Sequence, residues 1–584
     1  MERKNFVRQI TAASGNRKAE LVLKHASIVN VYTEEVEEGD IAIENGFIVG
    51  IGEYDGEEEV NLEGAVVCPG FIDGHIHLES SMVSPEEFQK AVLPHGTTTV
   101  ITDPHEIANV AGTAGIDYMI QVTGRLAMDV FFMMPSCVPS TDLDESGAVL
   151  DADDLRPYYA NERVLGLAEL MDSYGTINGE ADILKKVEDA RKAGKKIDGH
   201  APFLSGQGLN AYVTAGVSSD HECSTISEAK EKMRRGQWIM IREGTAAHNL
   251  ETLLPLFEAP YYHRAMLVTD DKHPEDLLCL GHIDYIIKEA VKAGADPVKA
   301  VIMGSRNAAE YFGLNDRGAV APGCRADLTI VSDLESFLVK WVFKDGKLVA
   351  KEGKCFPETI LPEPEIDQIV KQKVFDSFHM PKLKEEDLYL PVTGKKAKVI
   401  CLTPHELLTT EAIFPVAAHQ GTAPGVNLER DIIKLAVVER HQNTGRIGLG
   451  YLSGYGLKKG AVASSIAHDS HNLIIAGIND SDMVLAGNCV RENNGGLAIA
   501  VDGKVIASLA LPLAGLMSNL SLEDTKRQLE YLKEMLRSMG IAEDIDPFMT
   551  LAFVSLPVIP ALRLTTYGLI DVNGRKVIRV FSDN

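Results

Sequence analysis

His75 and His77 stand two positions apart in a segment, residues 69–77, that follows an apolar, strand-forming run. Positions i and i+2 of a β-strand point to the same side, so both imidazoles can reach one metal ion. Two buried core histidines would leave the same pattern. The strand context, the small Gly74 beside the pair and further candidate ligands downstream favour a metal site.

Other side chains that bind divalent metals stand in or directly after later strand-like runs. Each alone has a structural explanation, such as a solvated strand end, a helix start or a helix N-cap before Pro274. Together, these imidazoles and carboxylates would hold two divalent ions, and nitrogen and carboxylate ligands suit Zn, Fe(II) or Mn. The candidates are Glu169, His200, His221 and either Asp270 or Asp271, between which the sequence does not decide.

These side chains need elements that carry them to one place. Between residues 68 and 312, strand-like runs alternate with helical stretches. Eight such βα units match the size of a (β/α)8 TIM barrel, an α/β fold whose active site lies at the C-terminal ends of its strands. The predicted strands end near Asp73, Asp103, Pro135, Leu170, Gly199, Asp220, Arg242 and Thr269.

The segments on both sides of the predicted barrel alternate apolar and polar residues between turn signals. Residues 1–67 and 313–355 are therefore predicted to build one β-sandwich domain together. Residues 356–366 are rich in Pro and Glu and are predicted to be a linker. Residues 367–584 are predicted to form a separate α+β domain.

The amino-acid composition narrows the classes of molecule that this chain could bind. The chain has 84 acidic and 57 basic residues and a net charge of −27, which disfavours nucleic acid and anionic membranes. Its eight cysteines are scattered without a Cys-x-x-Cys pair, and the N-terminus has no apolar secretion segment, so we expect a reducing cytoplasm. We expect a small-molecule substrate and a homo-oligomer, a dimer or larger.

The order of the candidate ligands resembles the amidohydrolase superfamily. That pattern has His-x-His on strand one, a bridging acid on strand four, His on strands five and six, and Asp on strand eight. Residues 307–309 (Asn-Ala-Ala) and 318–328 are also typical of the superfamily, and the resemblance covers about residues 20–350. Hydantoinases and dihydroorotases bridge their metals with a carboxylated lysine on strand four, where this chain has only Glu169.

Within the superfamily, several stretches resemble the bacterial and archaeal adenine deaminase family. They are residues 77–82 (His-Leu-Glu-Ser-Ser-Met), 102–110, 269–271 and, in the predicted C-terminal domain, 464–472. The resemblance then spans nearly the whole chain. It implies hydrolytic deamination of adenine to hypoxanthine and ammonia in purine salvage, with two divalent ions.

The resemblance also implies which residues bind which metal ion. His75, His77 and Asp270 would bind one metal, His200 and His221 the other, and Glu169 would bridge them. A bridging hydroxide would attack C6 of the purine, because metal ions lower the pKa of bound water from 15.7 toward about 7.

The proton transfers need further groups. Asp270 would take the proton of the water and pass it to the departing ammonia. Ring N1 also gains a proton, for which Glu106 and His105 are candidates, although Glu is favourable at any helix N-terminus. Substrate contacts are predicted for a third set, in which the C-terminal members would form a lid over the barrel mouth or only a polar turn. This set is Glu79, Ser80, His468, Asp469 and His471.

Two alternatives remain at the level of sequence. The chain could be another cyclic amidase or deaminase of the same superfamily, or a catalytically inactive scaffold that has kept the barrel. The separate zinc deaminase class, with His-x-Glu and Pro-Cys-x-x-Cys signatures, is excluded because the chain has no Cys-x-x-Cys.

Overall fold

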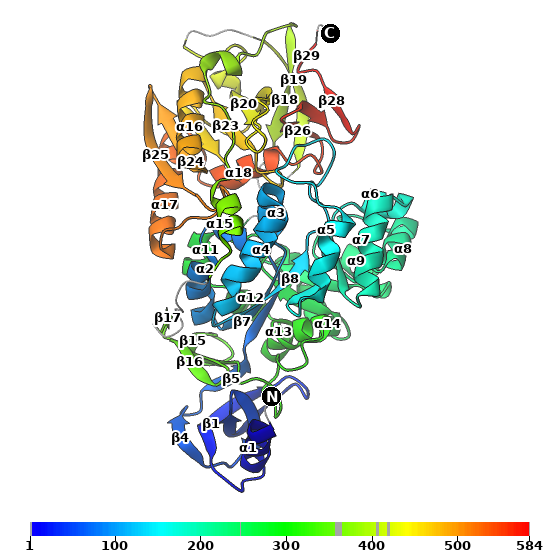
Figure 1. Ribbon diagram of the computed structural model, residues 1–584, viewed down its shortest axis with the longest axis vertical. Helices are drawn as coiled ribbons and strands as arrows, with labels where there is room; N and C mark the ends of the chain where they lie inside the picture. Colours follow the sequence, from blue (N-terminus) through cyan, green and yellow to red (C-terminus); the bar gives the residue numbers. More distant parts are fainter. Residues whose placement is uncertain (1–2, 246, 357–364, 404–407, 417–420, 583–584) are drawn as a thin grey trace.

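The computed structural model describes residues 3–245, 247–356, 365–403, 408–416 and 421–582. The chain runs from an N-terminal β-rich part, through a mixed middle part, to a C-terminal part built on a second large sheet (Figure 1). Most of the predicted linker, residues 357–364, lies outside the described residues.

The middle part contains eight parallel strands among its described residues, paired in two sheets with the orders β6–β7–β8–β9–β10 and β11–β12–β13. Strands β10 and β11 are in contact, and a parallel bridge between Ile76 and Asp270 joins the end of β6 to the residues after β13. Each strand ends within three residues of its predicted end. The bounds are β6 Phe71–Ile76, β7 Thr97–Thr102, β8 Asp129–Met134, β9 Val164–Leu170, β10 Lys196–Gly199, β11 Ser219–Asp220, β12 Trp238–Arg242 and β13 Ala265–Val268.

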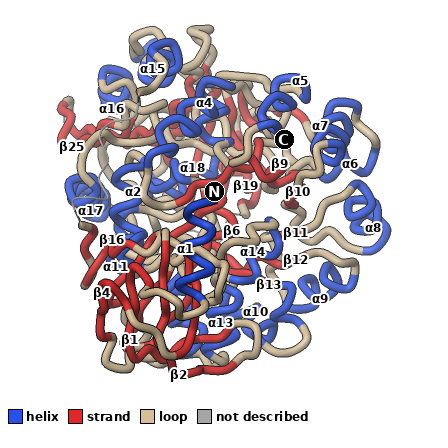
Figure 2. The backbone as a smooth tube through the Cα atoms, turned by 60° about the horizontal axis from the view of Figure 1, so that its bottom comes forward, coloured by secondary structure: helices blue, strands red, loops and turns tan. Residues whose placement is uncertain are grey.

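Side chains from six of these strands meet in one buried apolar cluster, and two aromatic residues of α14 join it. The strands therefore surround a shared interior. Helices lie outside them (Figure 2). The strand contributions are Ile72, Ile101, Met133, Ala168, Met240 and Met266.

Helices α2 to α10 connect successive strands of this part, as βα units require, and α11 to α14 follow β13. Their bounds are α2 Pro85–Val92, α3 His105–Ala111, α4 Thr113–Val122, α5 Ala152–Leu155, α6 Ser173–Asn178, α7 Ala181–Lys192, α8 Gly206–Ala215, α9 Ile226–Arg234, α10 Leu250–Leu253, α11 Pro274–Cys279, α12 Ile283–Lys292, α13 Pro297–Met303 and α14 Arg306–Phe312.

Both flanks of the middle part contribute to one sheet, of order β17–β16–β15–β14–β5–β1–β2–β3, with β4 also paired to β1. The long strand β1 pairs with β4 up to Lys24 and with β5 from Ser27, and His25 between them has a φ of 56°. The sheet therefore bends at this point. The bounds are α1 Arg3–Ala13, β1 Ala19–Asn30, β2 Glu35–Glu44, β3 Phe47–Gly52, β4 Gly56–Asn61, β5 Val66–Pro69, β14 Leu328–Val331, β15 Val339–Lys344, β16 Lys347–Lys351 and β17 Lys354–Cys355.

The C-terminal part has a sheet of order β19–β18–β21–β20–β23–β22–β24–β25, with β29 on β18, and a smaller sheet β26–β27–β28. Its mixture of helices and mainly antiparallel strands agrees with the predicted α+β class. The bounds are α15 Gln368–Phe375, β18 Lys396–Leu402, β19 Thr409–Pro415, β20 Ile432–Val438, β21 Ile447–Ser453, β22 Ala461–Ser464, β23 Leu473–Gly477, α16 Asp480–Glu492, β24 Gly496–Val501, β25 Lys504–Ala510, α17 Leu522–Ser538, α18 Pro547–Val554, β26 Leu562–Thr565, β27 Gly568–Asp571, β28 Lys576–Ile578 and β29 Phe581–Ser582.

Polar contacts attach the C-terminal part to loops and to helix α11 of the middle part. The backbone N–H of Ser518 donates to the Met82 carbonyl at 2.8 Å, and Asn472 Nδ2 donates to the Glu145 carbonyl at 2.7 Å. The Lys533 ammonium bonds to Glu275. Within the described ranges, no helix combines the length and apolar character needed to cross a membrane.

Candidate metal centre and active site

Glu169, the second-to-last residue of β9, lies at the centre of the predicted ligands. Its Oε1 is 3.3 Å from His77 Nε2 and 4.0 Å from His75 Nε2. Its Oε2 is 2.8 Å from His200 Nδ1 and 3.3 Å from His221 Nε2. The carboxylate thus presents one oxygen to each pair of imidazoles, which is the arrangement a bridging ligand needs.

The two histidines of β6 and its end are oriented as metal ligands. Nδ1 of His77 lies 3.0 Å from the Asp103 carbonyl, so Nδ1 carries the hydrogen and Nε2 offers its lone pair to the cluster. Nε2 of His75 is buried and has no hydrogen-bond partner among the described residues. An orphaned imidazole nitrogen at this position fits a ligand for a cation.

The two aspartates that follow β13 have different partners. Asp270 Oδ1 lies 3.2 Å from His77 Nε2, whereas Asp271 Oδ1 accepts a hydrogen bond from Ser80 Oγ at 2.5 Å. Asp270 adopts a φ of 60°, a left-handed conformation that Asp tolerates better than most residues, and its N–H donates to the His75 carbonyl at 3.0 Å. Asp270 is therefore the residue that faces the cluster.

Electrostatics differ among the proposed imidazole ligands. Burial opposes protonation of His77, His200 and His221, yet neighbouring carboxylates raise the pKa of each above its ordinary value, and only His75 is held neutral. Burial, together with the neighbouring His221, lowers the pKa of His75 to about 3. Burial alone would raise the pKa of Glu169, but hydrogen bonds with His105 and His200 keep it well below its ordinary value. Neutral imidazole and ionised carboxylate are the forms that bind a divalent ion.

His105 lies closer to these ligands than the sequence indicated. Its Nδ1 is 2.9 Å from Asp103 Oδ2 and 3.3 Å from Glu169 Oε1, while its Nε2 is 3.3 Å from Glu106 Oε1. His105 therefore connects the central carboxylate to Glu106. Asp103 is a site residue that the sequence analysis named only as a strand end.

Glu106, in the first turn of α3, meets two histidines of the C-terminal part. His468 Nδ1 lies 2.6 Å from Glu106 Oε1, and His471 Nε2 bonds to Glu106 Oε2. The N–H of Ala467 donates to His471 Nδ1 at 3.2 Å, so the ring hydrogen of a neutral His471 sits on Nε2 and points to Glu106. This tautomer disfavours a further metal ion at these three side chains.

The charges of Glu106 and His468 agree with these contacts. Burial opposes ionisation of Glu106, yet the histidines His468, His471 and His105 hold its pKa well below the ordinary value. Burial would lower the pKa of His468, but Glu106 raises it to about 9. The cluster therefore combines an ionised carboxylate with a protonated imidazole.

Two further residues were missed as site residues. Arg242, at the end of β12, contacts both Asp270 and Glu222, the residue after His221. Glu222 Oε1 lies 3.3 Å from His221 Nε2. Both stand at or just after predicted strand ends, and this position could have indicated them as site residues.

Comparison with known proteins decides the family. Residues 66–349 match the model of the amidohydrolase family, and residues 406–576 match that of the adenine deaminase C-terminal domain. The protein called adenine deaminase 2 from Carboxydothermus hydrogenoformans is 48% identical over 571 residues, covering 98% of each chain. Adenine deaminases from Bacillus pumilus and Geobacillus kaustophilus are 45% and 46% identical, each over 98% of both chains. The chain belongs to the adenine deaminase family.

The two family-matched regions meet at a small pocket beside the ligand cluster. Glu79 is buried there; its Oε1 accepts from the Ile107 N–H at 3.1 Å, and its Oε2 has no hydrogen-bond partner among the described residues. Burial raises the pKa of Glu79 to about 7. The pocket is lined by Glu79, Ser80, Met82, Glu106, His273, Ile466, His468, His471, Leu516 and Met549.

Asp469 alone of the predicted substrate contacts does not line this pocket. Its Oδ2 is buried without a hydrogen-bond partner in the described part of the chain. Burial raises the pKa of Asp469 to about 6. Four of the five predicted substrate-contact residues of this adenine deaminase family chain therefore line one pocket.

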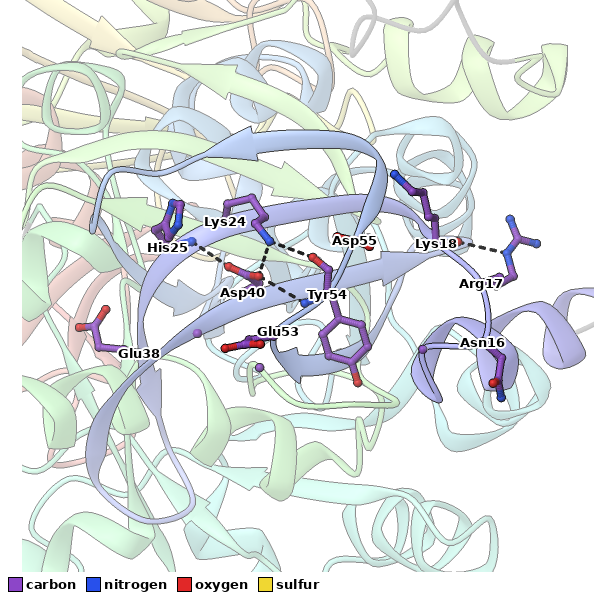
Figure 3. A pocket seen from close by; sticks show the side chains of 13 residues that line it. Asn16, Arg17, Lys18, Lys24, His25, Glu38, Asp40, Glu53, Tyr54 and Asp55 are labelled. Atoms are coloured by element: carbon purple, nitrogen blue, oxygen red, sulfur yellow. Dashed lines mark hydrogen bonds and ion pairs between the residues drawn. The ribbon is translucent and has the colours of Figure 1, made fainter.

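A larger, open hollow lies in the N-terminal β-rich part and is unrelated to the cluster (Figure 3). It is lined by residues between Gly15 and Asp55, none of which is a predicted ligand. Its central cation is already satisfied, because Lys24 Nζ lies 2.6 Å from Asp40 and 2.9 Å from the Tyr54 carbonyl.

Proposed function

We propose that this chain hydrolyses adenine to hypoxanthine and ammonia. The observation that carries the proposal is Glu169, whose two oxygens each face a pair of imidazoles. Relatives called adenine deaminase, at 45–48% identity over nearly the whole chain, support the substrate. The complete ligand set disfavours a catalytically inactive scaffold.

The residues present fit two divalent ions, Mn, Fe(II) or Zn. We assign His75, His77 and Asp270 to one ion, His200 and His221 to the other, and Glu169 to both. When bound, such ions lower the pKa of water and so supply a strong nucleophile at neutral pH. The observations that support this assignment are the unpartnered His75 Nε2 and the placement of Asp270 Oδ1.

Asp270 is proposed as the group that moves the proton of the attacking water. Its Oδ1 faces the enclosed cluster and can accept that proton, then donate it to the amino nitrogen that leaves C6. Burial opposes ionisation of Asp270, yet the Arg242 guanidinium on the opposite oxygen helps to hold the pKa of this carboxyl well below its ordinary value. The carboxylate is therefore in the basic form before the reaction.

Recognition and protonation of the ring are assigned to the pocket beside the cluster. We propose that Glu106 and His105, with His468 and His471, form the acid–base group for ring N1. Glu79 and Ser80 would contact the polar edge of the base, and Asp469 would support the cluster electrostatically. Apolar side chains around a few polar groups suit a planar base.

We also propose the finer architecture. The eight parallel strands would close into a (β/α)8 barrel over residues 68–312, which their shared apolar interior supports. The bent sheet would fold as a sandwich from residues 1–67 and 313–355. Residues 367–584 would form the C-terminal domain, which closes the barrel mouth through His468 and His471.

A substrate panel tests the proposal. Ammonia release is measured for adenine, guanine, cytosine and a hydantoin, using protein stripped with a chelator and reloaded with Mn(II) or Fe(II). Release from adenine alone, and only after reloading, is expected. Turnover of a hydantoin or cytosine in place of adenine would favour the alternative of another superfamily hydrolase.

A further inference from the structure

Arg242 is a buried cation that joins the two halves of the site. Its Nη1 lies 2.7 Å from Asp270 Oδ2 and 2.5 Å from Glu222 Oε1, and its Nη2 lies 3.1 Å from Glu222 Oε2. Its side chain is only 13% exposed. A buried guanidinium between two carboxylates is held by its partners, and it holds them in return.

Each carboxylate also faces an imidazole of the ligand cluster. Asp270 contacts Arg242 through Oδ2 and His77 through Oδ1, at 3.2 Å. Glu222 Oε1 lies 3.3 Å from His221 Nε2 and 3.6 Å from His200 Nδ1. One guanidinium therefore anchors a carboxylate in each half of the cluster.

This contact controls the rotation of the Asp270 carboxylate. The backbone of Asp270 is set by its hydrogen bond to His75 and by its left-handed φ, but these leave the carboxylate free to turn about its last bond. The Arg242 bond to Oδ2 removes that freedom and leaves Oδ1 directed at the imidazoles. A planar guanidinium can bind both carboxylates at defined angles, whereas a lysine ammonium is a single point charge.

We propose that Arg242 is a positioning residue for the reaction: it holds Asp270 Oδ2 so that Oδ1 stays directed into the ligand cluster, and it holds Glu222 against His200 and His221. This inference rests on the proposed function, because it assigns Asp270 the proton transfer. Arg242 itself touches neither the base pocket nor the imidazoles in the contacts between described residues. Its loss should therefore slow turnover more than it weakens substrate binding.

The test compares Arg242→Lys with Arg317→Lys in the full-length, Mn(II)-loaded protein. Arg317 is a matched control, since it is also buried and also holds two carboxylates, Asp129 at 2.6 Å and Asp316 at 2.9 Å, away from the ligand cluster. The readouts are kcat and KM for adenine, bound Mn(II), the thermal midpoint, and the visible spectrum of the Co(II)-loaded protein. Arg242→Ala is assayed with and without added guanidinium ion.

For Arg242→Lys we expect kcat to fall by about 100-fold, as a small misplacement of a reacting group can cause. KM should change by less than about threefold, with Mn(II) content retained and a changed Co(II) spectrum. Guanidinium should partly restore kcat of Arg242→Ala, and Arg317→Lys should keep wild-type kcat and spectrum.

Three results would overturn the inference. One is wild-type kcat in Arg242→Lys; another is a fall in kcat that only parallels lost metal; the third is a raised KM with unchanged kcat. If Arg242→Lys does not fold, absence of guanidinium rescue in Arg242→Ala counts against it. A wild type that is inactive on adenine refutes the proposed function instead, and the Co(II) spectrum then still tests the positioning.

Discussion

Glu106→Gln removes one charge at the junction of the two parts while preserving the shape of the side chain. Because the Ala467 N–H fixes the hydrogen of a neutral His471 on Nε2, the new amide oxygen can accept from it. The new amide NH2 can donate to His468 Nδ1 once that imidazole has lost its Nδ1 proton. Both hydrogen bonds can persist, and the ion pair between Glu106 and His468 is lost.

The expected magnitudes differ sharply for stability and for catalysis. A hydrogen bond to a charged group contributes about 1.5–3 kcal/mol against about 0.5–1.5 kcal/mol for a neutral one, so we expect the variant to lose about 1–3 kcal/mol. A general acid–base group contributes about 10²–10⁴-fold, equal to about 3–5 kcal/mol of activation free energy. Turnover should therefore fall far more than stability.

The assay is ammonia release from adenine by Mn(II)-loaded protein, with metal content and the thermal midpoint measured in parallel. Glu145→Gln is the control, because Glu145 also joins the two parts, through Arg446 and Thr566, without lining the pocket. We expect kcat to fall only in Glu106→Gln. A kcat within about threefold of wild type would refute the acid–base role, and a loss explained by missing metal would place Glu106 among the supports of the ligands.

Three other outcomes are expected. Asp270→Asn should lower kcat by about 10²–10⁴-fold, whereas Asp271→Asn, whose partner is Ser80, should cost less than about tenfold; the reverse order in ammonia release would exchange their roles. Chelation should abolish activity and Mn(II) should restore it, and activity that survives complete metal removal would contradict the two-ion assignment. Burial raises the pKa of Asp144 to about 7, so its stabilising contribution is present at low pH and is lost as pH rises through 7. Asp144→Asn should therefore raise the thermal midpoint at pH 8, by the equivalent of up to about 4 kcal/mol, and hardly at pH 4; an equal shift at both pH values would contradict this.

Local sequence determined the strands and the candidate residues at their ends. The apolar runs that end near Leu170 and Arg242 are strands that end at those residues. This agreement has a physical cause, because burial on both faces demands a continuous apolar run whatever the rest of the chain does. His75 and His77 likewise owe their common direction to the period of the strand alone.

The choice between neighbouring residues required the tertiary structure. Asp270 and Asp271 are the same residue type at adjacent positions, so the sequence cannot distinguish them. The bridge between Asp270 and Ile76 directs Asp270 toward His77, and Asp271 bonds to Ser80 instead. A side-chain direction of this kind depends on the partner strand, which no local pattern encodes.

Contacts between segments far apart in the chain also could not be predicted from the sequence. Glu106 and His471 are 365 positions apart, and Arg242 meets Asp270 across 28 positions. Each of these residues has an ordinary local explanation, at a helix start, in a polar turn or at a strand end. The sequence by itself determined the strands and helices on which, or next to which, these residues lie. Only the packing of neighbouring strands, and of the C-terminal part against their ends, decided which charges meet, because a buried charge is tolerated only where the folded chain supplies its partner.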